Sequence, residues 1–273
     1  EQEGFFLMPR EEEGMGRPLD IAPLACIPTT SGTGSEVSMA AVIKDPVEKV
    51  KLEIADFPLF PRLAILDPET TRTLPPAVAA ATGMDAMTHA IEGYVSQDWS
   101  PHQDARSLHA LRMIRDNLER AVQHGEEDEE ARGNMLIAAN LAITIGLGSV
   151  HAMSHPAGAQ FGVPHGVANA IHLPHVVRFN AEGGDDIADR YRDIADVFGV
   201  ESGGPGAEVG HALADNFTEL VERLGLPVRL SQVGVPESGI PALVEGAMGD
   251  GTTILNPREP SEGDYEELYK RAL

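Results

Sequence analysis

The chain has 273 residues, of which 42% are hydrophobic, so it is long enough to bury the core of one large domain or two small ones. Its 43 acidic and 20 basic residues give a net charge of −23, which argues against nucleic acids and anionic membranes as partners. No apolar run comes near the roughly 18 residues of a membrane span, and the initial EQEGFFLMPREEEG lacks the basic and apolar regions of a signal peptide.

Two features of the composition bear on the cellular setting. The single cysteine, Cys26, cannot form an intramolecular disulfide, which favours a reducing cytoplasm. Lysine is scarce beside the acidic residues, and this balance suits a salt-rich cytoplasm, where ions screen the repulsion between carboxylates. The composition fits a halophilic protein and an ordinary acidic protein equally well.

Residues 1–72 have the pattern of strands separated by turns. Apolar or alternating runs are bounded by Gly, Pro, Asp and hydroxyl residues, namely LACIPTT, VSMAAVI, KLEIADF and RLAILDPE. A complete nucleotide-binding domain needs several βα units, and this segment is too short to hold them. We therefore predict a strand-rich segment that forms only part of such a domain.

After Pro75 and Pro76 the apolar residues follow a helical period, so residues 73–273 are predicted to form a helical domain. The stretch 129–155 is apolar almost all round and is predicted as one buried central helix. The fold class is α+β, leaning to mainly α. The predicted helices lie within 75–96, 102–125, 129–155, 186–200, 209–230, 237–248 and 260–273.

Three histidines fall close together near the middle of the chain. His151 and His155 are four residues apart and so share one face of a helix. The Pro-His-Gly sequence around His165 marks a helix break that turns this side chain back towards the same space. A second pair with the spacing of four residues, Asp85 and His89, lies in the Ala-rich stretch GMDAMTHAIEGY.

These spacings favour a metal site. A buried carboxylate costs several kcal/mol unless it is paired or binds a metal, and no Lys or Arg lies beside Asp85 in the sequence. One carboxylate with imidazoles suits iron(II), zinc, nickel or cobalt, whereas calcium and magnesium prefer oxygen ligands. The Asp-x-x-x-His pair alone is more often a surface pair or a helix cap, and a His-x-x-x-His pair alone is also less often a metal site than not. The other histidines, His172 and His175 among them, are more simply structural.

Several motifs together resemble the iron-containing (group III) alcohol dehydrogenases. The resemblance covers nearly the whole chain, and its most specific parts are the two stretches that carry the candidate ligands. The matching stretches are PTTSGTGSEV, LAILDPE, LPPAVAAATGMDAMTHAIEGYVS, GLGSVHAMSHPAGAQFGVPHGVANAIHLPHVVRFN and DGTTILNPREPSEGDYEELYKRAL.

The resemblance implies a role for each candidate residue. It implies a metal-dependent, NAD(P)-dependent oxidoreductase in which a Lewis-acidic metal polarises an alcohol and hydride passes to the nicotinamide. The metal is implied to be Fe(II), with zinc as the alternative. The implied metal ligands are Asp85, His89, His151 and His165, and His155 lies beside the metal near the nicotinamide and substrate as the proton relay.

The resemblance also assigns part of the dinucleotide site. Without the family, the glycines of this stretch indicate only a tight turn, and the lysine only an exposed strand position. With the family, they match positions that contact NAD or NADP: Thr29, Thr30, Ser31, Gly32, Thr33 and Lys51.

The family's N-terminal α/β half, with its Gly-Gly-Gly-Ser pyrophosphate loop, has no counterpart in these residues. The sequence therefore leaves open a homodimer, or a separate chain that supplies this half. It also leaves open a truncated, metal-binding helical fragment without redox activity. A metal-dependent hydrolase, with His155 as general base, is the weakest alternative, because it leaves TTSGTGSE unexplained.

Overall fold

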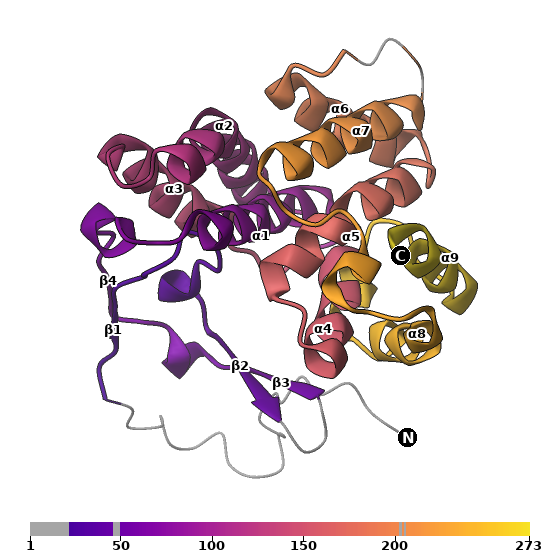
Figure 1. Cartoon of the computed structure of the whole chain (residues 1–273), viewed down its shortest axis with the longest axis horizontal. Coiled ribbons are helices and arrows are strands. Elements are labelled where there is room, and N and C mark those ends of the chain that lie inside the picture. Colours follow the sequence, from indigo (N-terminus) through magenta and orange to yellow (C-terminus); the bar gives the residue numbers. More distant parts are fainter. Residues whose placement is uncertain (1–21, 46–49, 202–203, 205) are drawn as a thin grey trace.

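A strand-rich leading segment passes into a helical body at Pro75–Pro76 in the computed structural model, which describes residues 22–45, 50–201, 204 and 206–273 (Figure 1). The predicted class, α+β leaning to mainly α, is confirmed. The first 21 residues of the predicted segment 1–72 lie outside the described residues, and a domain boundary near residue 72 stays a prediction.

The leading segment contains two separate strand pairs. Strand β1 (Ala25–Cys26) pairs in parallel with β4 (Leu63–Ala64), and β2 (Ala40–Asp45) pairs antiparallel with β3 (Val50–Ala55). All four strands fall within or next to the predicted runs. Each pair stands alone in the part of the chain that the structure describes, so both have open edges.

Helix α1 (Pro76–Val95) is the centre of the helical body. Its proline at the first position suits a helix start, and most of its residues after Ala79 are buried. It packs against α2 (Pro101–Gln123) and α3 (Glu129–Ala142) on one side and against α5 (His165–Ala181) on another (Figure 1). The remaining helices are α4 (Ser149–Phe161), α6 (Asp185–Phe198), α7 (Glu208–Arg223), α8 (Ile240–Met248) and α9 (Glu262–Ala272).

The prediction of one central helix over 129–155 is wrong. Helix α3 ends at Ala142 and α4 begins at Ser149, and the residues between them are not helical. The Thr144 hydroxyl accepts a hydrogen bond from the Gly146 amide at 2.9 Å, which replaces helical pairing with a local turn. The break allows α4 to run in a new direction, so that its first turn meets α1.

The break around His165 is confirmed. Helix α4 ends at Phe161, the next residue Gly162 has a left-handed conformation (φ 72°) that suits glycine, and α5 begins at His165 after Pro164. The sequence analysis did not predict α5, because Pro174 interrupts its helical pattern.

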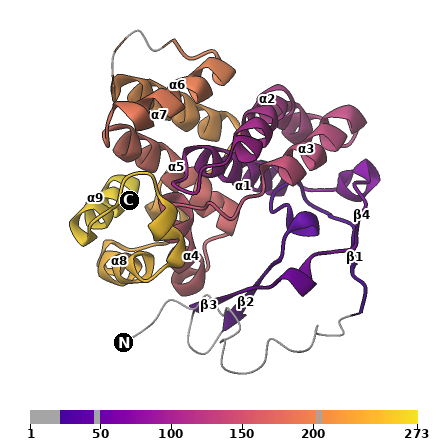
Figure 2. The same ribbon diagram turned by 180° about the vertical axis from the view of Figure 1, so that it is seen from behind.

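The apolar core belongs to the helical body. Its buried cluster is drawn from residues between Ala80 and Ala272, and Tyr191, Phe217 and Tyr265 are among its largest members. Figure 2 shows the strands of the leading segment to one side of this body. Among the described helices, none is both long and apolar enough to cross a membrane.

Candidate metal centre and cofactor loop

Asp85 and His89 lie one turn apart on α1, and both side chains are buried. Two other helices bring His151 and His165 to the same place. The Nε2 atoms of His165, His151 and His89 lie 3.4, 3.7 and 3.8 Å from Asp85 Oδ1. Residues about 80 positions apart in the sequence therefore meet at one buried carboxylate oxygen.

Three of these residues form a possible metal site. The ligand atoms of Asp85, His151 and His165 all lie within 4.8 Å of one another. Metal–ligand bonds of about 2.1 Å in a tetrahedral site place neighbouring ligand atoms about 3.4 Å apart, close to the spacing found here. His89 lies beside this group, with its ring 4.6 Å from that of His151. One carboxylate with imidazoles is also a donor set that divalent iron or zinc accepts.

The start of α5 comes unusually close to α1, and this approach sets the position of His165. A Cβ built on Gly166 would lie 2.0 Å from the carbonyl oxygen of Ala81. Only glycine fits there without moving one of the two helices. The glycine that marks the helix break in the sequence thus also brings the neighbouring histidine to Asp85.

Asn169 belongs to the same cluster, although the sequence analysis did not single it out. Its Nδ2 donates to Asp85 Oδ1 at 2.8 Å and lies 3.4 Å from His165 Nε2 and 3.5 Å from His151 Nε2. The Asn169 amide nitrogen thus lies within 3.5 Å of all three ligand atoms. Its position four residues after His165, on the same helix face, is the signal that could have identified it.

Glu92 is a second buried carboxylate in the cluster, beside Asp85, and the sequence analysis did not single it out. Its Oε2 accepts a hydrogen bond from His151 Nδ1 at 2.5 Å, and its side chain is buried. Glu92 lies one turn beyond His89 on α1, and an acidic residue in this apolar helix could have drawn attention. The candidate ligand His151 is therefore held between two carboxylates.

The charges of the cluster favour a bound cation. Burial alone would raise the pKa of Asp85, but the neighbouring imidazoles of His151, His89 and His165 bring it below its ordinary value. Burial lowers the pKa of His151, yet the carboxylates of Glu92 and Asp85 outweigh this and raise it to about 9. Burial and the charge of His151 lower the pKa of His89 to about 4. Near neutral pH, Asp85 is thus a carboxylate and His89 a neutral imidazole, the forms that bind a metal, whereas His151 carries a second ring proton that a bound metal would displace.

His155 lies next to the cluster and has its own carboxylate partner. Its ring stacks against that of His165, with the centroids 5.5 Å apart, and its Nδ1 lies 2.7 Å from Asp250 Oδ2. Asp250 Oδ1 accepts from the Thr252 amide at 3.0 Å and from the Thr252 hydroxyl at 2.6 Å. Sequence spacing could not reveal this pair, because Asp250 lies in a loop 95 residues further along the chain.

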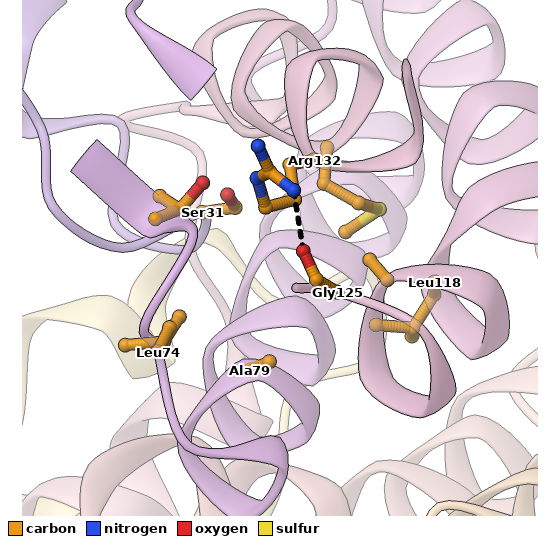
Figure 3. Close-up of a pocket in the computed structure, with 9 residues that line it drawn as sticks. Ser31, Leu74, Ala79, Leu118, Gly125 and Arg132 are labelled. Atoms are coloured by element: carbon orange, nitrogen blue, oxygen red, sulfur yellow. Dashed lines mark hydrogen bonds between the residues drawn. The ribbon is translucent and has the colours of Figure 1, made fainter. Parts of the chain in front are cut away.

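The predicted cofactor loop, residues 29–33, lies against the helical body. Ser31 and Gly32 are buried, while Thr29 and Thr33 are exposed. Ser31 also lines a pocket between the loop and α1–α3, where Leu74 and Arg132 are among its neighbours (Figure 3). The loop therefore offers two exposed threonine hydroxyls, and Ser31 faces the pocket instead.

The other predicted positions are described only in part. Lys51 lies on β3, where its backbone pairs with Lys44, and nothing is described of its side chain. His172, predicted to be structural, lies buried with its Nδ1 3.1 Å from Ser154 Oγ and its ring edge-on to Tyr269. The pocket beside Ser31 has lining residues distinct from the histidine cluster.

Known proteins resemble this chain over most of its length. The chain is 41% identical to lactaldehyde reductase of Escherichia coli K12 over 253 residues, which cover 92% of the chain and 65% of the relative. A crystal structure of 1,3-propanediol oxidoreductase superposes with a TM-score of 0.86 at 37% identity, over 92% of the chain and 66% of that protein. An archaeal halo-thermophilic alcohol dehydrogenase from a Red Sea brine pool also gives 0.86, at 31% identity and with 92% and 64% covered.

The chain thus spans 65% of the length of the E. coli relative. Two family models match separate parts of it. The model described as "Fe-containing alcohol dehydrogenase family, C-terminal" matches residues 79–273, and that described as "Iron-containing alcohol dehydrogenase" matches residues 6–68. The family that the motifs resemble is confirmed, and the chain belongs to the iron-containing alcohol dehydrogenases.

Proposed function

We propose that the chain is the metal-binding part of an NAD(P)-dependent alcohol dehydrogenase, which interconverts an alcohol and an aldehyde or ketone by hydride transfer. The observation that carries this proposal is the meeting of Asp85, His151 and His165 from three helices. The names of the relatives, a lactaldehyde reductase and a 1,3-propanediol oxidoreductase, support the reaction class. The single cysteine supports a cytoplasmic setting.

We assign the metal to Asp85, His89, His151 and His165, with Fe(II) as the ion and zinc as the alternative that the same ligands accept. When bound, a divalent ion here supplies a Lewis acid for the substrate oxygen, and NAD(P) supplies the hydride acceptor. The chain's own contribution is a buried cluster in which the carboxylates of Asp85 and Glu92 hold the His151 imidazole in place.

His155 is proposed to move the proton that alcohol oxidation releases. Asp250 accepts from Nδ1 of the ring, and we assign the transfer of the substrate proton to the other ring nitrogen, Nε2. The double hydrogen bond from Thr252 holds Asp250 in turn. Because His155 is proposed to act without binding the metal, its replacement should slow hydride transfer and leave the metal bound.

The dinucleotide is proposed to contact Thr29, Thr30, Ser31, Gly32, Thr33 and Lys51, together with an α/β half from a preceding segment or a separate chain. The apolar side chains that the strand pairs expose support a partner at this place. Leu24, Ile27 and Leu63, on or beside the β1–β4 pair, are 48%, 52% and 53% exposed. A homodimer is the other arrangement that we retain from the family.

Metal analysis and cofactor titration test this proposal on protein purified without oxygen. We expect near-stoichiometric iron or zinc, and quenching or enhancement of NAD(P)H fluorescence on binding. Absence of both metals contradicts the assigned centre. Metal without NAD(P)H binding at about millimolar cofactor, the upper end of the usual range of KM values, leaves the alternative of a metal-binding fragment. Adding the α/β half of a relative then tests whether the missing part restores binding.

A further inference from the structure

Glu92 contacts both the candidate ligand His151 and the first backbone amides of α4. The side chain is 4% exposed and reaches from α1 to the first turn of α4. One carboxylate oxygen, Oε2, accepts from His151 Nδ1 at 2.5 Å. The other, Oε1, accepts from the backbone amides of Val150 at 2.7 Å and His151 at 3.4 Å.

These contacts matter because α4 has no cap of its own. The residue before it, Gly148, has no side chain to accept from the first amides of the helix. Side chains from elsewhere in the chain do so: Asn256 Oδ1 accepts from the Ser149 amide at 3.1 Å, and Glu92 takes the next two. A Cβ on Gly148 would lie 2.8 Å from Asn256 Oδ1 and 3.2 Å from Glu92 Oε1. The two caps therefore need glycine at this position.

We propose that Glu92 is a positioning residue that sets both the ring and the backbone of His151. By accepting from Nδ1, it fixes the proton on that nitrogen and leaves Nε2 to face Asp85 and the metal. By accepting from the amides, it holds the turn that carries His151, where a negative charge at a helix N-terminus is favourable. The inference rests on the proposed metal centre.

This double role requires a carboxylate. Every group that faces Glu92 in these contacts is an N–H donor, so both oxygens must accept. In a Glu92→Gln variant one of the two positions becomes an NH2 group, which opposes either the ring N–H or the backbone amides. Loss of such an outer partner typically weakens metal binding by about 10-fold to 100-fold.

Asn256 provides the matched control. It caps the same helix turn through Ser149 but, among the described residues, makes no hydrogen bond to the His151 ring. Asn256→Ala should lower the melting temperature, because a cap and buried amide contacts are lost. It should leave the zinc affinity and the state of the His151 ring unchanged.

The experiment measures zinc affinity by chelator competition and the ring protons of histidine by 15N NMR, both on the full chain. In the zinc-loaded wild type we expect His151 to bind through Nε2 and to show an Nδ1 proton far downfield, as for a hydrogen bond to a carboxylate. Glu92→Gln should lose that signal and bind zinc about 10-fold to 100-fold more weakly.

Equal zinc affinity in wild type and Glu92→Gln overturns the inference while the metal centre stands. A wild-type spectrum without the downfield Nδ1 proton does the same, and it needs no variant to fold. Absence of zinc binding in the wild type overturns the metal centre and the inference with it. Weaker binding in Asn256→Ala equal to that in Glu92→Gln would reduce Glu92 to a helix cap.

Discussion

The helical body and the leading segment bury their apolar side chains to very different extents. In the body, a continuous cluster from Ala80 to Ala272 is shielded from water. In the leading segment, large apolar residues such as Phe57, Val42 and Ile43 are more than half exposed. A two-stranded sheet is marginal by itself in water, and each strand pair here has just two strands.

This difference separates the site that the chain forms by itself, the candidate metal centre, from the site that needs further structure, the candidate cofactor loop. The candidate metal centre lies wholly within the body, on α1, α4 and α5. The candidate cofactor loop lies in the leading segment, beside open strand edges. We therefore expect metal binding to depend on the body alone and cofactor binding to depend on added structure. The predictions below test this division, beginning with the largest effect.

Replacing a core phenylalanine of the body should cost far more than replacing one of the leading segment. Phe217 is fully buried and packs edge-on to Phe198 at 5.2 Å, so Phe217→Ala should lower the free energy of unfolding by about 3–5 kcal/mol. Phe57 is 78% exposed, and Phe57→Ala should change it by less than about 0.5 kcal/mol. Urea unfolding measures both. Equal losses would show that the leading segment is packed in solution.

Zinc should stabilise the body only when its ligands are intact. At a free zinc concentration of about 100 times the dissociation constant, binding adds about 2.7 kcal/mol to the free energy of unfolding. We expect this gain in the wild type, in His155→Ala and in the leading-segment variant Thr33→Ala, but not in His151→Ala. Thermal unfolding with and without zinc measures it. If His155→Ala loses the gain and His151→Ala keeps it, the two histidine roles are reversed.

Acid should destabilise the body through a histidine outside the metal cluster. Burial and the charge of His175 lower the pKa of His172 from its ordinary 6.5 to about 3. The unfolded chain therefore takes up a proton near pH 6.5 while the folded chain does not. The contribution of His172 to the free energy of unfolding is therefore fully present above about pH 6.5 and decreases as the pH falls towards 3. At about pH 5 the loss is about 2 kcal/mol.

The control for this pH effect is an exposed histidine on α2. Unfolding of the metal-free protein is measured at about pH 7.5 and pH 5 in wild type, His172→Gln and His102→Gln. The difference between the two pH values should shrink in His172→Gln and persist in His102→Gln. A difference that persists in both variants would assign the acid sensitivity to other groups.

The smallest expected effect comes from the charged surface of the chain. With a net charge of −23, added salt should screen repulsion between carboxylates. We expect the melting temperature to stay level or rise between about 0.1 and 2 M KCl. A steady fall would argue against adaptation to high salt, even though one structural relative is halo-thermophilic.

Much of the fold follows from the spacing of apolar residues and from the proline and glycine residues that begin or end helices and strands. The proline start of α1 and the apolar spacing of α2 predict both helices, and the short apolar runs predict the strands. The break between α3 and α4 was missed because a stretch that is apolar all round has no period to interrupt. Helix α5 was missed for a different reason, because Pro174 interrupts its helical pattern.

The candidate site was predictable only where it is local. Spacing of four residues identified His151 and its neighbours, and the structure brings Asp85, His151 and His165 together. Their roles stay predictions. Asp250 could not be found, because a loop carboxylate 95 residues from His155 leaves no pattern in the sequence.

One residue that caps α4 and the carboxylate that pairs with His155 are both synthesised long after α4 itself. The Ser149 amide donates to Asn256, which lies 107 residues later in the chain, and His155 pairs with Asp250, which lies 95 residues later. Ribosomes add about 5–20 residues per second, so several seconds separate the synthesis of Ser149 and His155 from that of their partners Asn256 and Asp250. The nascent chain therefore carries all four proposed metal ligands before the Ser149 amide is capped and before His155 has its carboxylate partner.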